Sequence, residues 1–198
     1  MTAVASLSTL LRLARDTLAN PREGAVAVLN FAPPRDALWL MLALVIVVSM
    51  LLGEAVALVA GISADGPLTG PMITNSPLVL GLLQGAFLFV MIHAIHRIGR
   101  AFGGTGRFEE AMLLVIWLQF IFILVQLVQV LAFTLLPGLA AIITILALGL
   151  FFWLLTNFIA VLHGFTSLGM VFVATILSLV GIIFAMSLVL ALLGVGMT

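Results

Sequence analysis

The chain has 198 residues, of which 65% are hydrophobic and 7% are charged, and its seven basic and seven acidic residues give a formal net charge of zero. A soluble domain has about 25% charged residues and buries only about 70% of its surface, so this composition excludes a soluble globular protein. The lack of cysteine excludes disulfides, thiolate zinc sites and iron–sulfur clusters, and the lack of a basic tract argues against a nucleic-acid partner.

Residues 1–37 form a polar leader in which we predict two short amphipathic helices. The first covers residues 7–19 and places arginines opposite an apolar face. That face holds Leu7, Leu10, Leu11, Ala14 and Leu18. The stretch NPRE at 20–23 is typical of a helix start, with Asn20 as the cap and Pro21 at the first position. The two helices either lie along the membrane surface or pack on the ends of the spanning helices.

Residues 38–198 contain five apolar segments long enough to cross a bilayer, which takes about 20 residues. The run from residue 109 to residue 163 is too long for one span, and Pro137-Gly138 marks the corner where it folds back. We therefore predict an all-α, polytopic transmembrane bundle. Its five spans cover residues 38–60, 77–98, 109–136, 138–163 and 167–193.

The arginines predict the orientation of the bundle. All seven basic residues are arginines, and they lie either before the first span or between the second and third spans. The loops on the other side, residues 61–77 and the corner at 135–140, contain neither Lys nor Arg. The positive-inside rule then places the N-terminus in the cytoplasm and the C-terminus outside.

Polar residues within the spans form two predicted layers, which are the candidate intramembrane site. The outer layer holds Glu54, Gln84, Gln126 and Gln129, and the inner layer holds His93 and Asn157. We expect Glu54 to pair with Gln84 or Gln129. Such groups either line a proton or substrate path, or connect helices through hydrogen bonds worth about 0.6 kcal/mol each.

The polar stretch at 92–112 is predicted to be the main cytoplasmic loop. Gly103, Gly104 and Gly106 form its turn, and Glu109 and Glu110 occupy the first turn of the next helix. The candidate interface residues here are His96, Arg97, Arg100, Gly103, Gly104, Arg107, Glu109, Glu110 and His163.

The histidines carry no recognisable chemistry. His93 and His96 share a helix face, but a metal site would need a third ligand from Glu109, Glu110 or His163, and we expect no metal and no cofactor. The sequence has no motif for nucleophilic or phosphate chemistry, so we expect no enzyme.

Four stretches resemble the bacterial branch of the Yip family, the Ypt-interacting proteins. They are NPREGAVAVLN at 20–30, PPRDALWL at 33–40, GGTGRFEEA at 103–111 and NFIAVLHGF at 157–165. The resemblance implies a non-catalytic protein with five spans and a cytoplasmic N-terminus, located in the bacterial inner membrane. Eukaryotic members bind Rab-type GTPases and carry an Asp-Leu-Tyr-Gly-Pro signature, but this chain has no tyrosine, so Rab binding is not carried over.

Two functions remain open from the sequence. The first is a membrane-embedded adaptor or organiser that binds other membrane proteins, itself or lipids. It would use the leader, the cytoplasmic loop and lipid-facing small residues such as Gly81, Gly85 and Ala86. The alternative is a small transporter, channel or lipid-handling protein in which the two polar layers line a path.

Overall fold

The computed structural model describes residues 6–59 and 77–192, and within these ranges the chain forms α-helices without β-strands. The predicted all-α class is therefore confirmed. The helices are α1 (Leu7–Ala19), α2 (Pro21–Leu29), α3 (Arg35–Val59), α4 (Pro77–Ala101), α5 (Phe108–Leu135), α6 (Pro137–His163) and α7 (Leu168–Leu192). The predicted outer loop at 61–77 lies almost wholly outside the described residues.

The helix ends follow local signals in the sequence. The Ser6 hydroxyl accepts a hydrogen bond from the Thr9 N–H at 3.3 Å and caps α1. Pro21 and Pro137 stand at the starts of α2 and α6, where a missing N–H has no cost. Gly164 ends α6 with a φ of 73°, a left-handed conformation that glycine adopts readily. The predicted helix start at NPRE and the predicted corner at Pro137 are both found.

Four described helices are long and apolar enough to cross a membrane. They are Arg35–Val59, Leu78–Ala101, Phe108–Ala132 and Ala141–His163. These ranges overlap the first four predicted spans closely. The predicted fifth span corresponds to α7, whose fully described apolar part, Leu168–Ile182, is shorter than the others.

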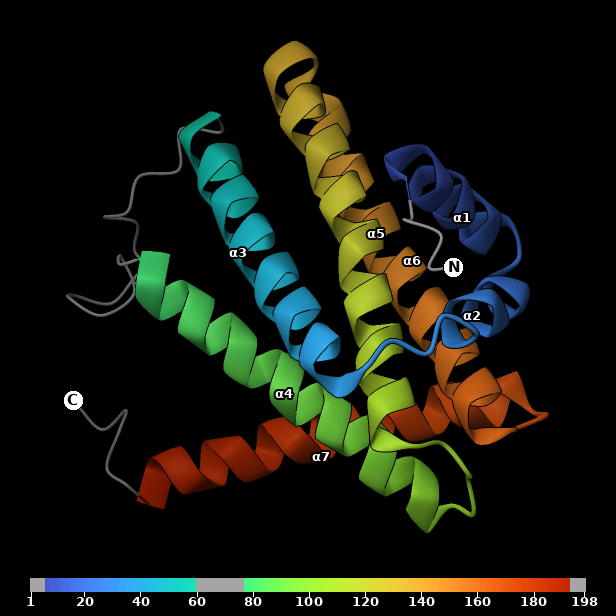
Figure 1. The fold of residues 1–198 in the computed structure, drawn as a ribbon. Helices are drawn as coiled ribbons and strands as arrows, with labels where there is room; N and C mark the ends of the chain where they lie inside the picture. The colour runs from blue at the N-terminus through green and yellow to red at the C-terminus, as the bar shows by residue number, and fades with distance from the viewer. Residues whose placement is uncertain (1–5, 60–76, 193–198) are drawn as a thin grey trace.

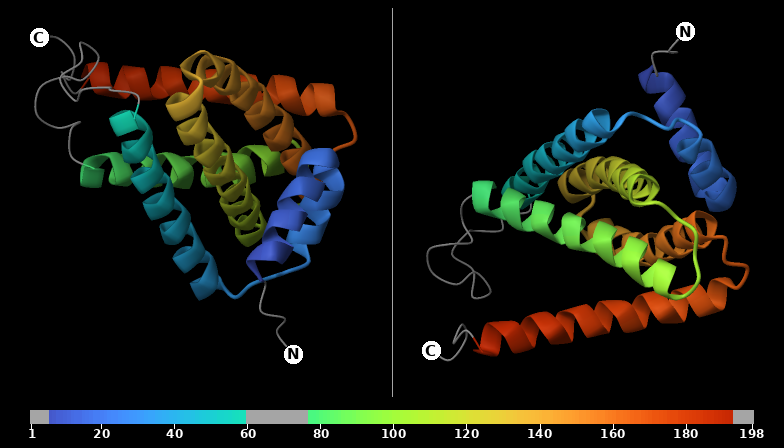
Figure 2. Two further views of the ribbon diagram at one scale, coloured as in Figure 1. Left: turned by 90° about the horizontal axis from the view of Figure 1, so that it is seen from above. Right: turned by 60° about the horizontal axis from the view of Figure 1, so that its bottom comes forward.

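Helix α5 is the centre of the molecule and contacts α2, α3, α4 and α6 (Figure 1). Helix α3 packs along α5 and also contacts α4, and the C-terminal end of α4 lies beside the start of α5 (Figure 1). Helices α5 and α6 run side by side as an antiparallel pair (Figure 1). Helix α7 contacts α6 and otherwise lies apart from the other helices (Figure 2).

The two ends of the bundle are packed very differently. Residues 111–118 of α5 are buried for two full turns, on every side of the helix. At the other end of the α5–α6 pair, Leu135 and Ile145 are 73% and 72% exposed. Exposed apolar surface on this scale is what a helix presents to lipid, so the dense core occupies one half of the molecule only.

The leader packs against the dense half of the bundle. Helix α1 lies on α2, and α2 contacts α5 and α6. The hydroxyl of the buried Thr17 donates to the Leu13 carbonyl at 2.7 Å and accepts from the Trp117 indole Nε1 at 3.2 Å. Of the predicted apolar face of α1, Ala14 is buried, whereas Leu7, Leu11 and Leu18 form an exposed stripe. The helix therefore uses one side for packing and keeps a second apolar side free.

Gly24 provides a test of this packing. A Cβ at Gly24 would lie 2.7 Å from the Thr17 Cα, so α1 and α2 can approach this closely only because position 24 lacks a side chain. We expect Gly24→Ala to lower the free energy of unfolding by about 1–3 kcal/mol, as overpacking does. The thermal midpoint of the purified protein in detergent measures the effect. Gly53→Ala is the matched control, because a Cβ at Gly53 meets no atom within 4 Å. Equal midpoints for the two variants would contradict the packing.

Candidate functional site

The imidazole of His163, the last residue of α6, connects three parts of the chain. Its Nδ1 accepts a hydrogen bond from the Gly106 N–H at 3.2 Å, and its Nε2–H donates to the Ile95 carbonyl at 3.1 Å. The side chain is 3% exposed, so both bonds are shielded from water. One neutral tautomer satisfies both ring nitrogens. We call this arrangement, which joins α6, α4 and the α4–α5 loop, the His163 junction.

Glycines make room for the ring in this junction. A Cβ at Gly99 or at Gly104 would overlap atoms of the His163 ring, and a Cβ at Gly106 would lie 2.6 Å from the Leu162 Cγ. The sequence predicted Gly103, Gly104 and Gly106 to form a turn. Only Gly103 has a positive φ, of 84°, whereas Gly104 and Gly106 are needed for close approach.

His93 and His96 lie beside Phe108 at the start of α5. The Nδ1–H of His96 donates to the Gly106 carbonyl at 3.2 Å, which adds a second histidine contact to the loop. The Nδ1–H of His93 donates to the Phe89 carbonyl one turn earlier in its own helix at 2.9 Å. The His93 and Phe108 ring centroids are 4.9 Å apart. Among the described residues no group of three or more His, Asp or Glu side chains is placed to hold a metal.

Charged residues tie the starts of α3 and α5 together. Arg35 lies 2.6 Å from the Glu109 carboxylate, and Arg107 lies 3.9 Å from it. The backbone N–H of Arg107 donates to the Glu110 carboxylate at 2.8 Å, which caps α5. Because Arg35 is 73% exposed, its ion pair stabilises the fold by about 0–1 kcal/mol and mainly fixes geometry. Arg97 and Arg100, in the last turns of α4, and Arg107, in the α4–α5 loop, have exposed side chains.

The predicted outer polar layer does not converge on one point. Gln129 donates to the Thr144 hydroxyl at 3.2 Å across the α5–α6 pair. Glu54 and Gln84 are half-buried and make no hydrogen bond to each other or to Gln129. The Gln126 Oε1 is buried without a hydrogen-bond partner among the described residues. Gln129 thus joins α5 to α6 rather than to Glu54.

Several connecting residues were not predicted from the sequence. Gln119 donates to the Ser49 hydroxyl of α3 at 3.2 Å. The Thr17–Trp117 bond also had no sequence signal, because its partners are 100 residues apart. Gly81 and Gly85, expected to face lipid, instead face Met50 and Ile46 of α3, where added Cβ atoms would lie 2.9 Å and 3.4 Å away. These glycines therefore serve packing within the chain.

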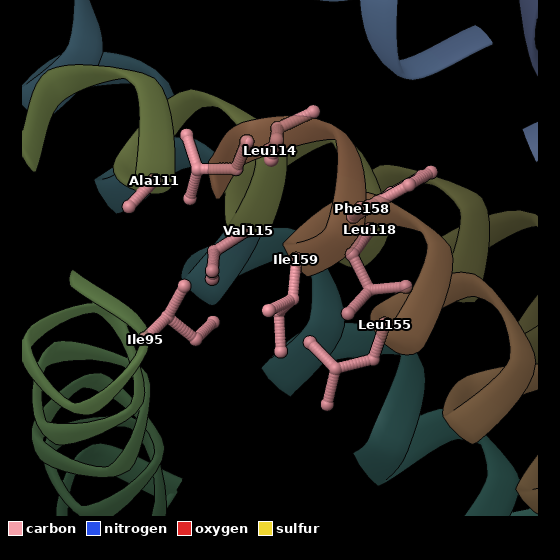
Figure 3. Close-up of a pocket in the computed structure, with 9 residues that line it drawn as sticks. Ile95, Ala111, Leu114, Val115, Leu118, Leu155, Phe158 and Ile159 are labelled. Carbon is pink, nitrogen blue, oxygen red and sulfur yellow. The ribbon is translucent and has the colours of Figure 1, made fainter. Parts of the chain in front are cut away.

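The space between α4, α5 and α6 is apolar. Figure 3 shows side chains from the three helices around a cavity of about 10 Å³, which is about the volume one water-sized sphere occupies. Its lining residues are Ile95, Ala111, Leu114, Val115, Leu118, Leu155, Phe158, Ile159 and Leu162. A space this small and without polar lining stays dry. Asn157 of the predicted inner polar layer does not line this cavity. It faces a separate polar cleft beside the leader.

The His163 junction predicts how the loop responds to substitution. His163→Phe keeps a ring of similar size but leaves the buried Gly106 N–H unpaired, which costs about 1–3 kcal/mol, and removes the second bond to the Ile95 carbonyl. We expect faster tryptic cleavage at Arg97, Arg100 and Arg107 in the detergent-solubilised protein. His93→Phe is the matched control, because His93 bonds only within its own helix. Equal cleavage rates in the two variants would contradict a loop held by His163.

One comparison with known proteins identifies the family of the chain. A family model described as the Yip1 domain matches residues 15–189, from the end of α1 almost to the end of α7. No curated protein matches the chain. No solved structure matches it either. The matched region holds the His163 junction, the arginine-bearing loop and all four long apolar helices. The chain therefore belongs to the Yip family of membrane proteins.

Proposed function

We propose that this protein is a non-catalytic adaptor, which uses its cytoplasmic face to hold or organise other proteins in the membrane. Family membership and the long apolar helices support a membrane protein. The adaptor role is our inference from the way the α4–α5 loop is built. A partner that docks on this loop would meet a surface of fixed shape and positive charge.

The observation that carries the proposal is the His163 junction. His163 and His96 both form hydrogen bonds with Gly106, and glycines pack against the His163 ring, so the loop is held at several points. Arg97, Arg100 and Arg107 are exposed around it. The junction fixes the loop residue Arg107 beside Arg97 and Arg100 of α4, so a partner binds the three arginines at low entropic cost. The acidic side chains of a second membrane protein fit this charge.

The packing of the core favours the adaptor over the transporter. A transport path through the bundle would need polar groups around a wet cavity between the two polar layers. The cavity between α4, α5 and α6 is instead small and lined by apolar side chains. His93 uses a hydrogen bond to a carbonyl of its own helix, so it does not depend on a group in a transport path.

We further propose that the chain crosses the cell membrane five times, with the leader (1–37) in the cytoplasm and the spanning region at 38–198. Helix α7 would be the fifth span, and the C-terminus would lie outside. The localisation would be the bacterial inner membrane. The arginine distribution supports this orientation, because all seven basic residues then lie on one side.

Single cysteines test the orientation directly, because the chain has none of its own. We expect Thr198→Cys to react with a membrane-impermeant maleimide in intact spheroplasts, and Thr105→Cys to react only after the membrane is opened. Thr105 lies exposed in the α4–α5 loop, so poor access within the fold would not protect it. Labelling of both positions from the same side would exclude five spans.

Cross-linking tests the adaptor role. A photoreactive amino acid at Arg100 or Arg107 should capture discrete membrane proteins in living cells, and the yield should fall several-fold in a His163→Phe background, because the loop loses its fixed shape. The same probe at Leu139, exposed at the opposite end of α6, is the control. Captured proteins that do not depend on His163, or that Leu139 captures equally, would contradict docking on this loop.

A further inference from the structure

A polar cleft separates the start of α2 from the end of α6 and the α6–α7 loop. Its volume is about 470 Å³, far larger than the apolar cavity in the core. Arg22 and Glu23 line it from α2, Asn157 lines it from α6, and Leu168 lines it where α7 begins. Nothing in the loop-docking role described above uses this cleft.

Asn157 is the buried polar group that faces the cleft. Its side chain is 5% exposed, yet it lines the cleft directly. One N–H of its amide donates to the Trp153 carbonyl at 2.8 Å. The second N–H and the Oδ1 have no hydrogen-bond partner among the described residues. The Asn157 Oδ1 is not among the fully enclosed side-chain atoms that lack a partner, so the free acceptor and the free donor are open to a ligand in the cleft.

Two opposite charges stand beside this amide. Arg22 and Glu23 are exposed neighbours in the first turn of α2, and neither forms an ion pair within the described part of the chain. Adjacent positions on a helix do not face each other, so the two charges are free to meet separate groups. The N-terminus of α2 adds positive potential, because the Asn20 side chain does not cap it.

We propose that this cleft binds the headgroup of phosphatidylethanolamine. Arg22 and the free N–H of Asn157 bind the phosphate, and Glu23 and the Asn157 Oδ1 accept from the ammonium group. Leu168 at the edge and the exposed Phe172, one turn further along the same side of α7, provide the apolar surface for the acyl chains. The paired charges suit a zwitterion, whereas the Glu23 carboxylate repels the purely anionic headgroup of phosphatidylglycerol.

The proposal rests on the placement of the leader at the inner membrane surface, where headgroups lie. It makes no use of a protein partner. Lipid retention in detergent depends on neither the orientation of the chain nor the docking of a partner on the loop. A negative result here would therefore leave the adaptor proposal standing, and a failure of cross-linking would leave this site standing.

Native mass spectrometry of the full chain tests the site. The detergent-solubilised protein is mixed with equal amounts of phosphatidylethanolamine and phosphatidylglycerol that carry the same acyl chains. We expect about tenfold more bound phosphatidylethanolamine, the effect of one charge-assisted hydrogen bond. Arg22→Gln should reduce binding of both lipids about tenfold, and Glu23→Gln should remove most of the preference.

Matched controls come from helix α1. Arg12→Gln and Asp16→Asn make the same charge changes on exposed residues that do not line the cleft, and both should leave lipid binding unchanged. If Arg12→Gln lowers binding as much as Arg22→Gln does, general surface charge explains the result and the site is wrong. If the wild type shows no preference between the lipids, the headgroup assignment is wrong. If soluble O-phosphoethanolamine binds as tightly as the lipid, the ligand is a free phosphoester instead.

Discussion

The hydrocarbon interior of a bilayer offers no hydrogen-bond partners, so polar groups in the spanning helices must find partners within the protein. This requirement explains most of the hydrogen bonds in the apolar helices. Backbone groups are satisfied within helices, and polar side chains in the apolar helices often follow the same rule. His93, Thr134, Asn157, Thr175 and Ser178 each donate to the carbonyl four residues earlier in their own helix. Among the described residues, side-chain hydrogen bonds between helices come from a few places: Gln119 with Ser49, Gln129 with Thr144, Trp117 with Thr17, Arg35 with Glu109, and the His163 junction.

The dense packing is concentrated where the chain carries its charges. The arginine-bearing loop, the leader and the buried turns of α5 all lie in the same half of the molecule. There the core resembles that of a soluble domain, with Trp117 donating to a buried threonine of the leader. The other half diverges and exposes large apolar side chains. One end of the bundle is therefore closely packed by the protein itself, and lipid covers the exposed apolar side chains of the other end.

The sequence predicted the bounds of the helices well, but it did not predict which helix faces pack against each other. Apolar runs and the Pro137 corner gave the long helices to within a few residues, and NPRE gave the start of α2. Depth along a span could be estimated, but the face of a helix and its neighbour could not. Gly81 was therefore expected to face lipid, and Glu54 was expected to pair with a glutamine. Arg35 and Glu109 are 74 residues apart, and no local pattern connects them.

The candidate site shows the same limit. The sequence analysis placed His163 and Gly104 in one polar region but gave them separate roles, as an interface residue and a turn residue. Their relation is steric: the ring occupies the space that a side chain at Gly104 would fill. The cleft beside Asn157 also depends on how the leader folds back onto α6, which no periodicity encodes.

The separation between Gly106 and His163 has a consequence for biosynthesis. The loop is made early, yet the imidazole that holds it lies 57 residues further along the chain. While the ribosome is still adding α5 and most of α6, the loop lacks its anchor. The arginines take their final arrangement only after α6 has been inserted beside α4. A polypeptide that terminates before His163 would thus never display the finished surface, which makes this face a marker of synthesis through the end of α6.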